Sequence, residues 1–294
     1  MINLRGFLPA LLVSGVMFLL GCSQPQKQKP IVTVTIAPQR YFAEKIAGDK
    51  FEIHTMVPYG SSPESFDPSP GALVNLSNSK AYFKIGYIGF ELAWMDKLQR
   101  NTPGMKVYDN SEGIELLENE DHNCSDPSHH HEVDQVIDPH IWSSPANGKK
   151  IAANMLKAFV ELDPDNRSYY EQNYDELLKE IQQTTDSIDG MLRDQEGDTF
   201  VIYHPSLTYL AHDYGLHQYA IENQGKEPSA AYLKNLIDEV KGSGAKVIFI
   251  QQEFDAKNAR MIGDELGLKV VSINPLSYDW NKELIEIAKA LDDK

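Results

Sequence analysis

Residues 164–194 read PDNRSYYEQNYDELLKEIQQTTDSIDGMLRD and carry a helical pattern of unusual length for this 294-residue chain. Apolar and aromatic side chains recur at spacings of three and four residues, and most positions between them hold Glu, Lys, Asp or Gln. The stripe consists of Tyr170, Tyr174, Leu177, Ile181, Thr184, Ile188 and Met191. A helix over this range is roughly 45 Å long at 1.5 Å per residue, as long as a small domain. Because the stripe covers only about three heptads, it favours a helix lying across two lobes over a coiled coil.

Short β-rich runs alternate with helical patterns on both sides of this helix. The expected strands are 31–36, 51–57, 81–85 and 105–108 before it, and 199–203, 218–221, 246–250 and 269–273 after it. Such alternation predicts parallel sheets flanked by helices. The sequence therefore predicts an α/β fold of two lobes, each a four-stranded, mostly parallel sheet flanked by helices, joined by a long helix.

The amino-terminal residues predict an export signal. Arg5 precedes an apolar run from Phe7 to Leu20 that is too short to span a membrane comfortably. The run ends in Leu-Leu-Gly-Cys at 19–22, which resembles the lipobox of bacterial lipoproteins, where the Cys becomes the lipidated first residue of the mature chain. The alternatives are an ordinary signal peptide and a short anchor helix.

These patterns divide the chain into five parts. We expect a signal peptide at 1–21, a lipidated tether at 22–30, an N-terminal lobe at 31–144, linking helices at 145–197 and a C-terminal lobe at 198–294. The N-terminal lobe contains a His-rich acidic loop at 118–135.

The composition narrows the class of partner. Hydrophobic residues make up 41% of the chain, which is enough for real cores, and the formal net charge is −16. Nucleic-acid binding needs a basic footprint, so this charge argues against it, and it disfavours binding to anionic lipid through the protein surface. A cation is a more natural partner.

Polar residues follow several of the expected strands. Open parallel sheets bind ligands outside the carboxyl ends of their strands, so these are candidate site residues. They are Glu64, His204, Glu253 and Asn274. The alternatives are a surface carboxylate for Glu64 and a satisfied core histidine for His204.

The stretch from His122 to Trp142 holds five of the nine histidines. His140 lies in Asp-Pro-His-Ile-Trp at 138–142, where Asp138 can accept a hydrogen bond from the imidazole; the alternative is a loop histidine packed on Trp142. The remaining metal-binding side chains form a group that no hydrophobic neighbour orders, and they suit weak, adaptable binding of Zn²⁺. This group consists of His122, Cys124, His129, His130 and His131. A solvated loop with no role is the alternative.

Six phrases, in this order, resemble the metal-specific solute-binding lipoproteins of bacterial ABC importers, the group that receives zinc or manganese. The phrases are VPYGSSPESFDPSP, the His-rich acidic loop, VIDPHIWSSP, FVIYHPSLTYLAHDYGL, GKEPS and INPLSYDW. The resemblance covers essentially the whole mature chain. It implies two α/β lobes with a long connecting helix and a metal ion between the lobes.

The resemblance also implies a set of ligands. His140 and His204 fall on ligand positions of the family, Glu64 stands where most members have a histidine, and Asn274 lies near where many have an aspartate. The departures at Glu64 and Asn274 leave the fourth position to water or another oxygen, with Glu253 as a further oxygen donor.

The expected function is that of an extracytoplasmic receptor, anchored by lipid at Cys22, that captures Zn²⁺ and delivers it to an ABC permease in the inner or cytoplasmic membrane. We expect a monomer, no nucleic-acid partner and no enzymatic activity. Two imidazoles and one carboxylate form a set that zinc accepts readily, although a carboxylate in place of a histidine hardens the site toward Mn²⁺ or Fe²⁺. The alternatives are a manganese or iron receptor, a zinc hydrolase and an adhesin in which the metal is structural.

Overall fold

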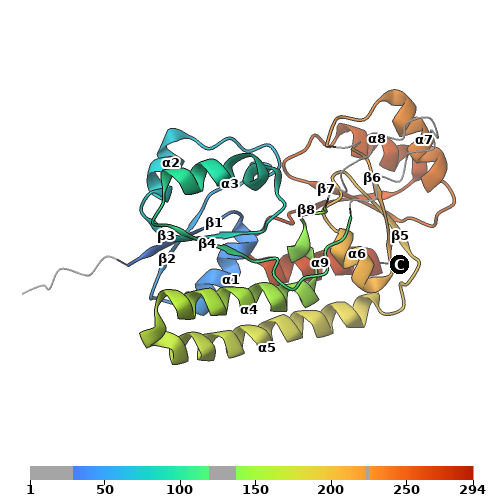
Figure 1. Ribbon diagram of the computed structural model, residues 1–294. Helices are drawn as coiled ribbons and strands as arrows, with labels where there is room; N and C mark the ends of the chain where they lie inside the picture. Colours follow the sequence, from blue (N-terminus) through green and yellow to red (C-terminus); the bar gives the residue numbers. More distant parts are fainter. Residues whose placement is uncertain (1–28, 119–136, 223–224, 294) are drawn as a thin grey trace, which may run out of the picture.

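The computed structural model describes residues 29–118, 137–222 and 225–293. Figure 1 shows two α/β lobes side by side above a pair of long helices that runs beneath both. The predicted signal peptide, Cys22 and the His-rich group of the loop lie outside the described residues.

The first lobe is a parallel sheet with the strand order β2-β1-β3-β4. Its strands are β1 (Ile31–Val34), β2 (Glu52–Thr55), β3 (Ser79–Lys84) and β4 (Lys106–Asp109), and its helices are α1 (Ala37–Ala47), α2 (Pro70–Leu76) and α3 (Gly89–Asn101). Val32 is in register with Ile53 of β2 and with Ala81 of β3, so β1 lies inside the sheet. These three side chains are buried, as the near-continuous apolar runs of parallel strands require.

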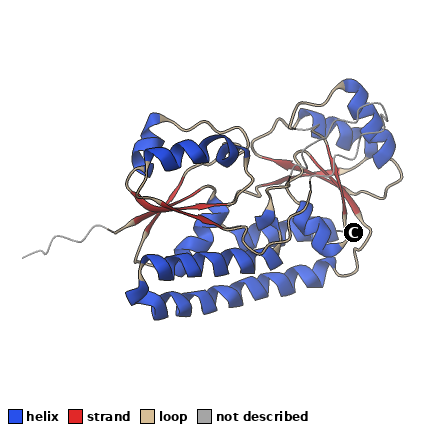
Figure 2. Ribbon diagram, viewed as in Figure 1, coloured by secondary structure: helices blue, strands red, loops and turns tan. Residues whose placement is uncertain are grey.

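The second lobe repeats this order as β6-β5-β7-β8. Its strands are β5 (Thr199–Ile202), β6 (His217–Ala220), β7 (Val247–Gln251) and β8 (Lys269–Ile273), and its helices are α6 (Thr208–Tyr214), α7 (Ala230–Val240) and α8 (Lys257–Leu266). In each sheet the strand order reverses beside the first strand, between β1 and β3 and between β5 and β7. Ligands of open α/β sheets bind at the carboxyl ends of the strands at such reversals. Figure 2 shows both sheets with helices packed around them, and the predicted fold class is confirmed.

Two helices form the base of the molecule. They are α4 (Pro145–Leu162) and α5 (Arg167–Leu192), and α5 packs against α1 of the first lobe and α9 (Trp280–Asp292) of the second. Ser144 caps α4 by accepting a hydrogen bond from the backbone N–H of Asn147 at 3.1 Å. The α5 helix, about 39 Å long at 1.5 Å per residue, therefore lies across both lobes as predicted.

The helix predicted from residue 164 begins as an α-helix only at Arg167. Its first three residues, Pro164–Asn166, form the 3-10 turn η2. The Asp163 carboxylate accepts hydrogen bonds from the Asn166 amide at 2.8 Å and the Tyr170 hydroxyl at 2.6 Å. These local side-chain bonds stabilise a tight turn in place of a regular first helical turn.

One continuous apolar core joins the two lobes to the base helices. Trp142 and Trp280 are fully buried where the lobes meet, and each donates its indole N–H to a backbone carbonyl. Trp142 donates to Pro275 at 2.9 Å, and Trp280 donates to Trp142 at 2.6 Å. A second, smaller cluster fills the other face of the second sheet, under α7 and α8. Among the described helices, none is both long enough and apolar enough to cross a membrane.

Candidate metal site

A buried carboxylate fixes the orientation of His140. The Asp138 Oδ1 atom accepts hydrogen bonds from the backbone N–H of His140 at 2.8 Å and from its ring Nδ1 at 2.9 Å. The Oδ2 atom accepts a bond from the Thr208 hydroxyl of the second lobe at 2.7 Å. The Trp142 ring packs 5.2 Å from the imidazole, centroid to centroid. Because Nδ1 donates to Asp138, the free lone pair is on Nε2, which faces His204.

The charges around His140 favour a cation. Burial on its own lowers the pKa of the His140 imidazole, but Asp138, with Glu64 and Glu222 farther away, raises it above the ordinary value. Burial on its own raises the pKa of Asp138, yet the charge of His140 and the hydrogen bonds from His140 and Thr208 hold it below the ordinary value. Any positive charge placed beside the ring, whether a proton or a metal ion, therefore meets a favourable field.

His204 lies two residues after the end of β5 and reaches the same region from the second lobe. The amide of Gln251, at the end of β7, accepts a bond from the backbone N–H of His204 at 3.3 Å and donates to its carbonyl at 2.6 Å. The ring Nδ1 pairs with Glu222 Oε1 at 2.7 Å, and the Phe254 ring stacks on the imidazole at 5.4 Å between centroids. His204 is therefore held in the same way as His140, with its Nε2 atom directed into the space between the lobes.

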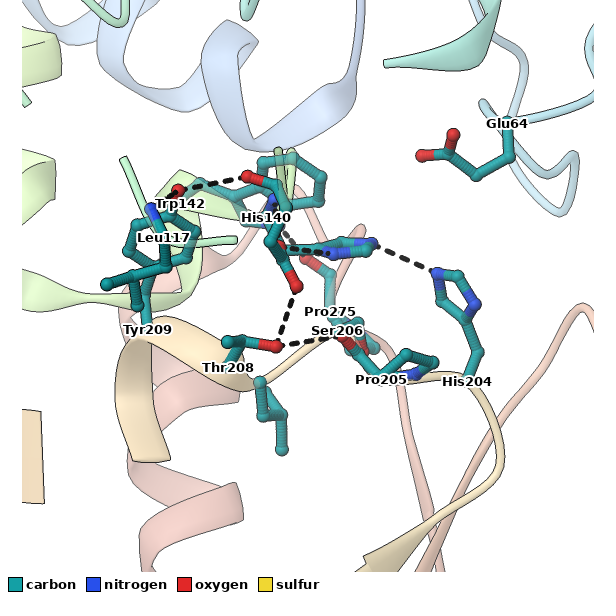
Figure 3. A network of polar contacts seen from close by, with 12 residues as sticks. Glu64, Leu117, His140, Trp142, His204, Pro205, Ser206, Thr208, Tyr209 and Pro275 are labelled. Atoms are coloured by element: carbon teal, nitrogen blue, oxygen red, sulfur yellow. Dashed lines mark hydrogen bonds and ion pairs between the residues drawn. The ribbon is translucent and has the colours of Figure 1, made fainter. Parts of the chain in front are cut away.

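The two imidazoles meet with their Nε2 atoms 3.0 Å apart. Figure 3 shows the two rings facing each other, with Glu64 on the loop of the first lobe and no hydrogen bond joining it to either ring. Zinc binds histidine nitrogen at about 2.0–2.1 Å with tetrahedral angles, which places two ligand nitrogens about 3.3 Å apart. A shift of a few tenths of an ångström thus makes room for an ion between His140 and His204.

A small cavity of about 30 Å³ lies beside the two rings. Glu64 and Glu253 line it together with His140 and His204. One oxygen of each carboxylate, Glu64 Oε1 and Glu253 Oε2, is buried and has no hydrogen-bond partner among the described residues. The volume exceeds the roughly 10–15 Å³ that one water molecule needs, so a single ion or water fits. Unpartnered buried oxygens are costly unless they bind something, and a cation satisfies both.

The two carboxylates are held differently. Glu64 Oε2 accepts a hydrogen bond from the backbone N–H of Gly89, the first residue of α3, at 3.0 Å. The positive end of the helix stabilises this carboxylate and leaves only Oε1 free. Burial raises the pKa of the Glu253 carboxyl, and the nearby His204 partly offsets that rise.

The structure does not bring all predicted residues together. Within the described ranges, no three His, Cys, Asp or Glu side chains are already close enough to coordinate an ion as they stand. Asn274 does not line the cavity, although Pro275 and Leu276 do, and its backbone N–H donates to Glu283 at 2.6 Å. Nothing in the structure tests the His-rich group of residues 122–131, which lies outside the described residues.

Sequence reasoning missed one residue that holds a site histidine. Glu222 follows the end of β6, the strand next to β5, and its carboxylate pairs with the His204 ring. The rule that directed attention to polar residues after strands applies to this position as well. The sequence signal was therefore present at Glu222 as well.

A family model for the periplasmic zinc-uptake complex component A matches residues 32–289. The chain belongs to this family. The resemblance predicted from the sequence phrases is thereby confirmed, and the two-lobed fold agrees with it. A solved structure of ZnuA shares 37% sequence identity with a TM-score of 0.82, covering 90% of this chain and 99% of the other.

Two curated relatives support the same family assignment. The high-affinity zinc uptake system protein ZnuA of Bacillus subtilis (strain 168) is 29% identical over 262 residues, covering 87% of this chain and 81% of that protein. The zinc-binding lipoprotein AdcA of Streptococcus pneumoniae (strain R6) is 29% identical over 273 residues. That alignment covers 88% of this chain but 53% of AdcA, so the chain spans about half the length of AdcA.

Proposed function

We propose that this chain is an extracytoplasmic receptor that captures Zn²⁺ between its two lobes and delivers it to an ABC permease. The observation that carries the proposal is the meeting of His140 and His204, each fixed through Nδ1 by a carboxylate, with their Nε2 atoms 3.0 Å apart beside a small cavity. Histidines that bind metal commonly donate their other ring N–H to a carboxylate in this way. The names of the relatives, a zinc uptake protein and a zinc-binding lipoprotein, support the same function.

The proposed ligands are the Nε2 atoms of His140 and His204 and the free oxygens of Glu64 and Glu253. Two carboxylates balance the double charge of the ion, and two neutral imidazoles complete a tetrahedral shell. The side chains must move together to form this shell, because the carboxylates are not yet in bonding range. If Glu253 does not move into bonding range, a water molecule takes its place as the fourth ligand. We propose no ligand role for Asn274, since it does not line the cavity.

Manganese is the second candidate ion. A shell with two carboxylate oxygens is harder than one of histidines alone and accepts Mn²⁺ or Fe²⁺ more readily. The two imidazoles and the zinc names of the relatives favour zinc.

The size of the cavity favours a metal-binding receptor over an enzyme. An organic substrate needs a cleft of about 300–1,000 Å³, whereas the space beside the two histidines measures about 30 Å³. It has room for an ion and not for a molecule to be hydrolysed, so we propose that the chain is not an enzyme.

The experiment that tests the function measures bound metal and fold together. Purified protein is analysed for metal content, stripped with a chelator, and then examined by circular dichroism and by reloading with zinc. A receptor keeps its fold without metal and reloads one tight ion per chain. Unfolding on chelation indicates a structural metal instead, and the absence of tight zinc binding rules out the receptor.

The lipid anchor at Cys22 and a monomeric state are further parts of the proposal. The name of AdcA, a lipoprotein, supports the anchor, as does the Leu-Leu-Gly-Cys sequence. Full-length wild type and Cys22→Ala are expressed and fractionated. Equal partition of the two proteins into the membrane contradicts the anchor.

We also propose that the His-rich loop serves as an ion collector outside the tight site. Glu118 and Ile137 form an antiparallel bridge at its base, and the backbone N–H of Asp138 donates to the Leu117 carbonyl at 2.9 Å. The described residues on either side of the loop thus lie next to each other, and Asp138, which orients His140, is held by contacts with described residues.

A further inference from the structure

A side-chain hydrogen bond connects the loop that carries Glu64 in the first lobe to the loop that carries Glu253 in the second. The hydroxyl of Tyr59, from the loop after β2, donates to Gln252 Oε1, from the loop after β7, at 2.5 Å. The two residues are 193 positions apart in the chain. Among the described residues, this is the one hydrogen bond that joins the loop carrying Glu64 to the second lobe.

Both partners stand beside a proposed ligand. Tyr59 precedes Glu64 by five residues on a loop that contributes Ser62, Pro63 and Glu64 to the cavity lining. Gln252 is the neighbour of Glu253, whose free oxygen faces the same cavity. Any movement that draws the two carboxylates apart must therefore also stretch the contact between Tyr59 and Gln252.

The other contacts between the lobes are buried. Trp142, which itself lines the cavity, and Trp280 donate buried indole hydrogen bonds, and the base helix α5 packs against both lobes. Tyr59, by contrast, is 79% exposed, so burial does not hold its side chain in place. The hydrogen bond to Gln252 is its link to the second lobe.

We infer that Tyr59 and Gln252 form a latch that closes the metal cavity and slows the release of the bound ion. This inference rests on the proposed function, because it concerns the ion held by His140, His204 and the two glutamates. The latch is not a ligand: it stabilises the closed arrangement and adds its own free energy to the barrier for opening. One partly exposed hydrogen bond between neutral groups slows opening by about three- to fivefold.

The test measures zinc release from the zinc-loaded mature chain by stopped flow into an excess of chromophoric chelator. Tyr59→Phe keeps the ring and removes the hydroxyl, and Gln252→Leu removes the acceptor. Each single variant is expected to release zinc about three- to fivefold faster than wild type. The double variant should be no faster than the faster single variant, because both substitutions break the same bond.

Tyr278→Phe is the matched control. The Tyr278 hydroxyl also joins the two halves of the molecule, donating to Glu44 of α1 at 2.7 Å, but neither of these residues adjoins a proposed ligand. Its removal should leave the release rate unchanged. A general loosening of the lobes would accelerate release in this variant too, and that result contradicts the latch.

Unchanged release rates in Tyr59→Phe and Gln252→Leu, with zinc still bound tightly, overturn the latch and leave the proposed function intact. Additive effects in the double variant also overturn it, because the two side chains would then act separately. If the wild-type protein takes up no zinc, the proposed function fails and the latch fails with it.

Discussion

At the scale of the residue, the candidate site consists of two histidines that are oriented in the same way from different lobes. Asp138 accepts the Nδ1 hydrogen of His140, and Glu222 does the same for His204. A carboxylate in this position fixes the tautomer and makes the other nitrogen a better ligand. The pairing therefore prepares both Nε2 atoms for a metal ion before one arrives.

We predict that Glu222→Ala weakens zinc binding by about 10- to 100-fold, because the His204 ring loses the partner that fixes its tautomer and orientation. Glu222→Gln keeps an acceptor oxygen and should recover most of the affinity. Competition titration against a chelator measures the affinity of all three proteins. Equal affinity of Glu222→Ala and wild type shows that the carboxylate does not position His204.

Glu64 is the predicted ligand that comes from the loop after β2 of the first lobe. Glu64→Ala should weaken zinc binding more than about 100-fold, since loss of a direct ligand costs more than loss of an outer hydrogen-bond partner. Glu64→His should retain zinc and weaken manganese, because imidazole is softer than carboxylate. Competition titrations with both ions measure the change. Asp67→Ala, an exposed carboxylate on the same loop, is the control and should bind both ions as wild type does. If Glu64→Ala keeps its zinc affinity, Glu253 or water must supply the oxygen.

At the scale of the element, the start of α3 holds the loop that carries Glu64. The backbone N–H of Gly89 donates to Glu64 Oε2 at 3.0 Å, and that of Phe90 donates to the Pro63 carbonyl at 3.1 Å. A Cβ atom on Gly89 would lie 2.3 Å from the Glu64 backbone oxygen. Only glycine allows the helix and the loop to approach this closely.

We therefore predict that Gly89→Ala displaces the Glu64 loop and lowers the zinc affinity at least about tenfold, the lower limit for loss of an outer hydrogen-bond partner. Gly104→Ala is the matched control in the same lobe, because a Cβ there meets no atom within 4 Å. Titration with zinc and thermal unfolding of both variants separate a local effect on the site from a general loss of stability. Equal zinc affinities of Gly89→Ala and Gly104→Ala contradict this role of α3.

The same helix carries a buried acid. The Glu91 carboxylate accepts hydrogen bonds from Thr35, from the backbone N–H of Ile85 at 2.9 Å and from that of Gly86 at 2.6 Å. Burial raises the pKa of Glu91 from 4.5 to about 7, and these hydrogen bonds only partly oppose it. Glu91 thus joins α3 to the carboxyl ends of β1 and β3, where the strand order reverses.

This raised pKa predicts a pH dependence of stability. The folded protein holds the Glu91 proton more tightly than the unfolded chain, so this contribution to the free energy of unfolding is full below pH 4.5 and is lost as the pH rises through about 7. Relative to Glu91→Gln, the free energy of unfolding of wild type should therefore fall by up to about 3 kcal/mol as the pH rises over this range. Urea unfolding of metal-free protein at several pH values measures it. A difference that stays constant from pH 4.5 to 7.5 contradicts the prediction.

The regular elements could be predicted from sequence because each depends on a local pattern. The strand at 269–273 and the helix from Pro145 were predicted at the observed positions or within one residue of them. The 3-10 turn at Pro164–Asn166 was not predicted, because it depends on the side-chain hydrogen bonds of Asp163 with Asn166 and Tyr170.

Contacts between distant parts of the chain escaped prediction. No periodicity in the sequence pairs Glu64 with the N–H of Gly89, 25 residues away, or Tyr59 with Gln252. His140, His204, Glu64 and Glu253 were predicted as candidates from their positions after strands or within a motif. Their meeting around one cavity depends on how the lobes pack, which only the three-dimensional structure gives.

At the scale of the whole molecule, the two lobes share a base and enclose a small cavity. The base helix α5 runs beneath both lobes (Figure 1), and the proposed ligands come from both lobes and line the cavity together. The apolar core runs through both lobes without help from the site, so the fold should persist when no ion is bound. A receptor needs both properties, because it must exist empty and loaded.

The most direct test of the central claim is a competition titration of the metal-free mature chain with zinc. Three proteins are compared: wild type, a variant in which residues 119–136 are replaced by a short glycine linker, and the double variant His140→Ala/His204→Ala. We expect one tight zinc ion per chain in wild type and in the loop deletion. The tight site should be absent from the double variant, whose circular dichroism should remain that of the folded protein. Survival of the tight site in the double variant, or its loss when only the loop is deleted, would show that His140 and His204 do not form the zinc site.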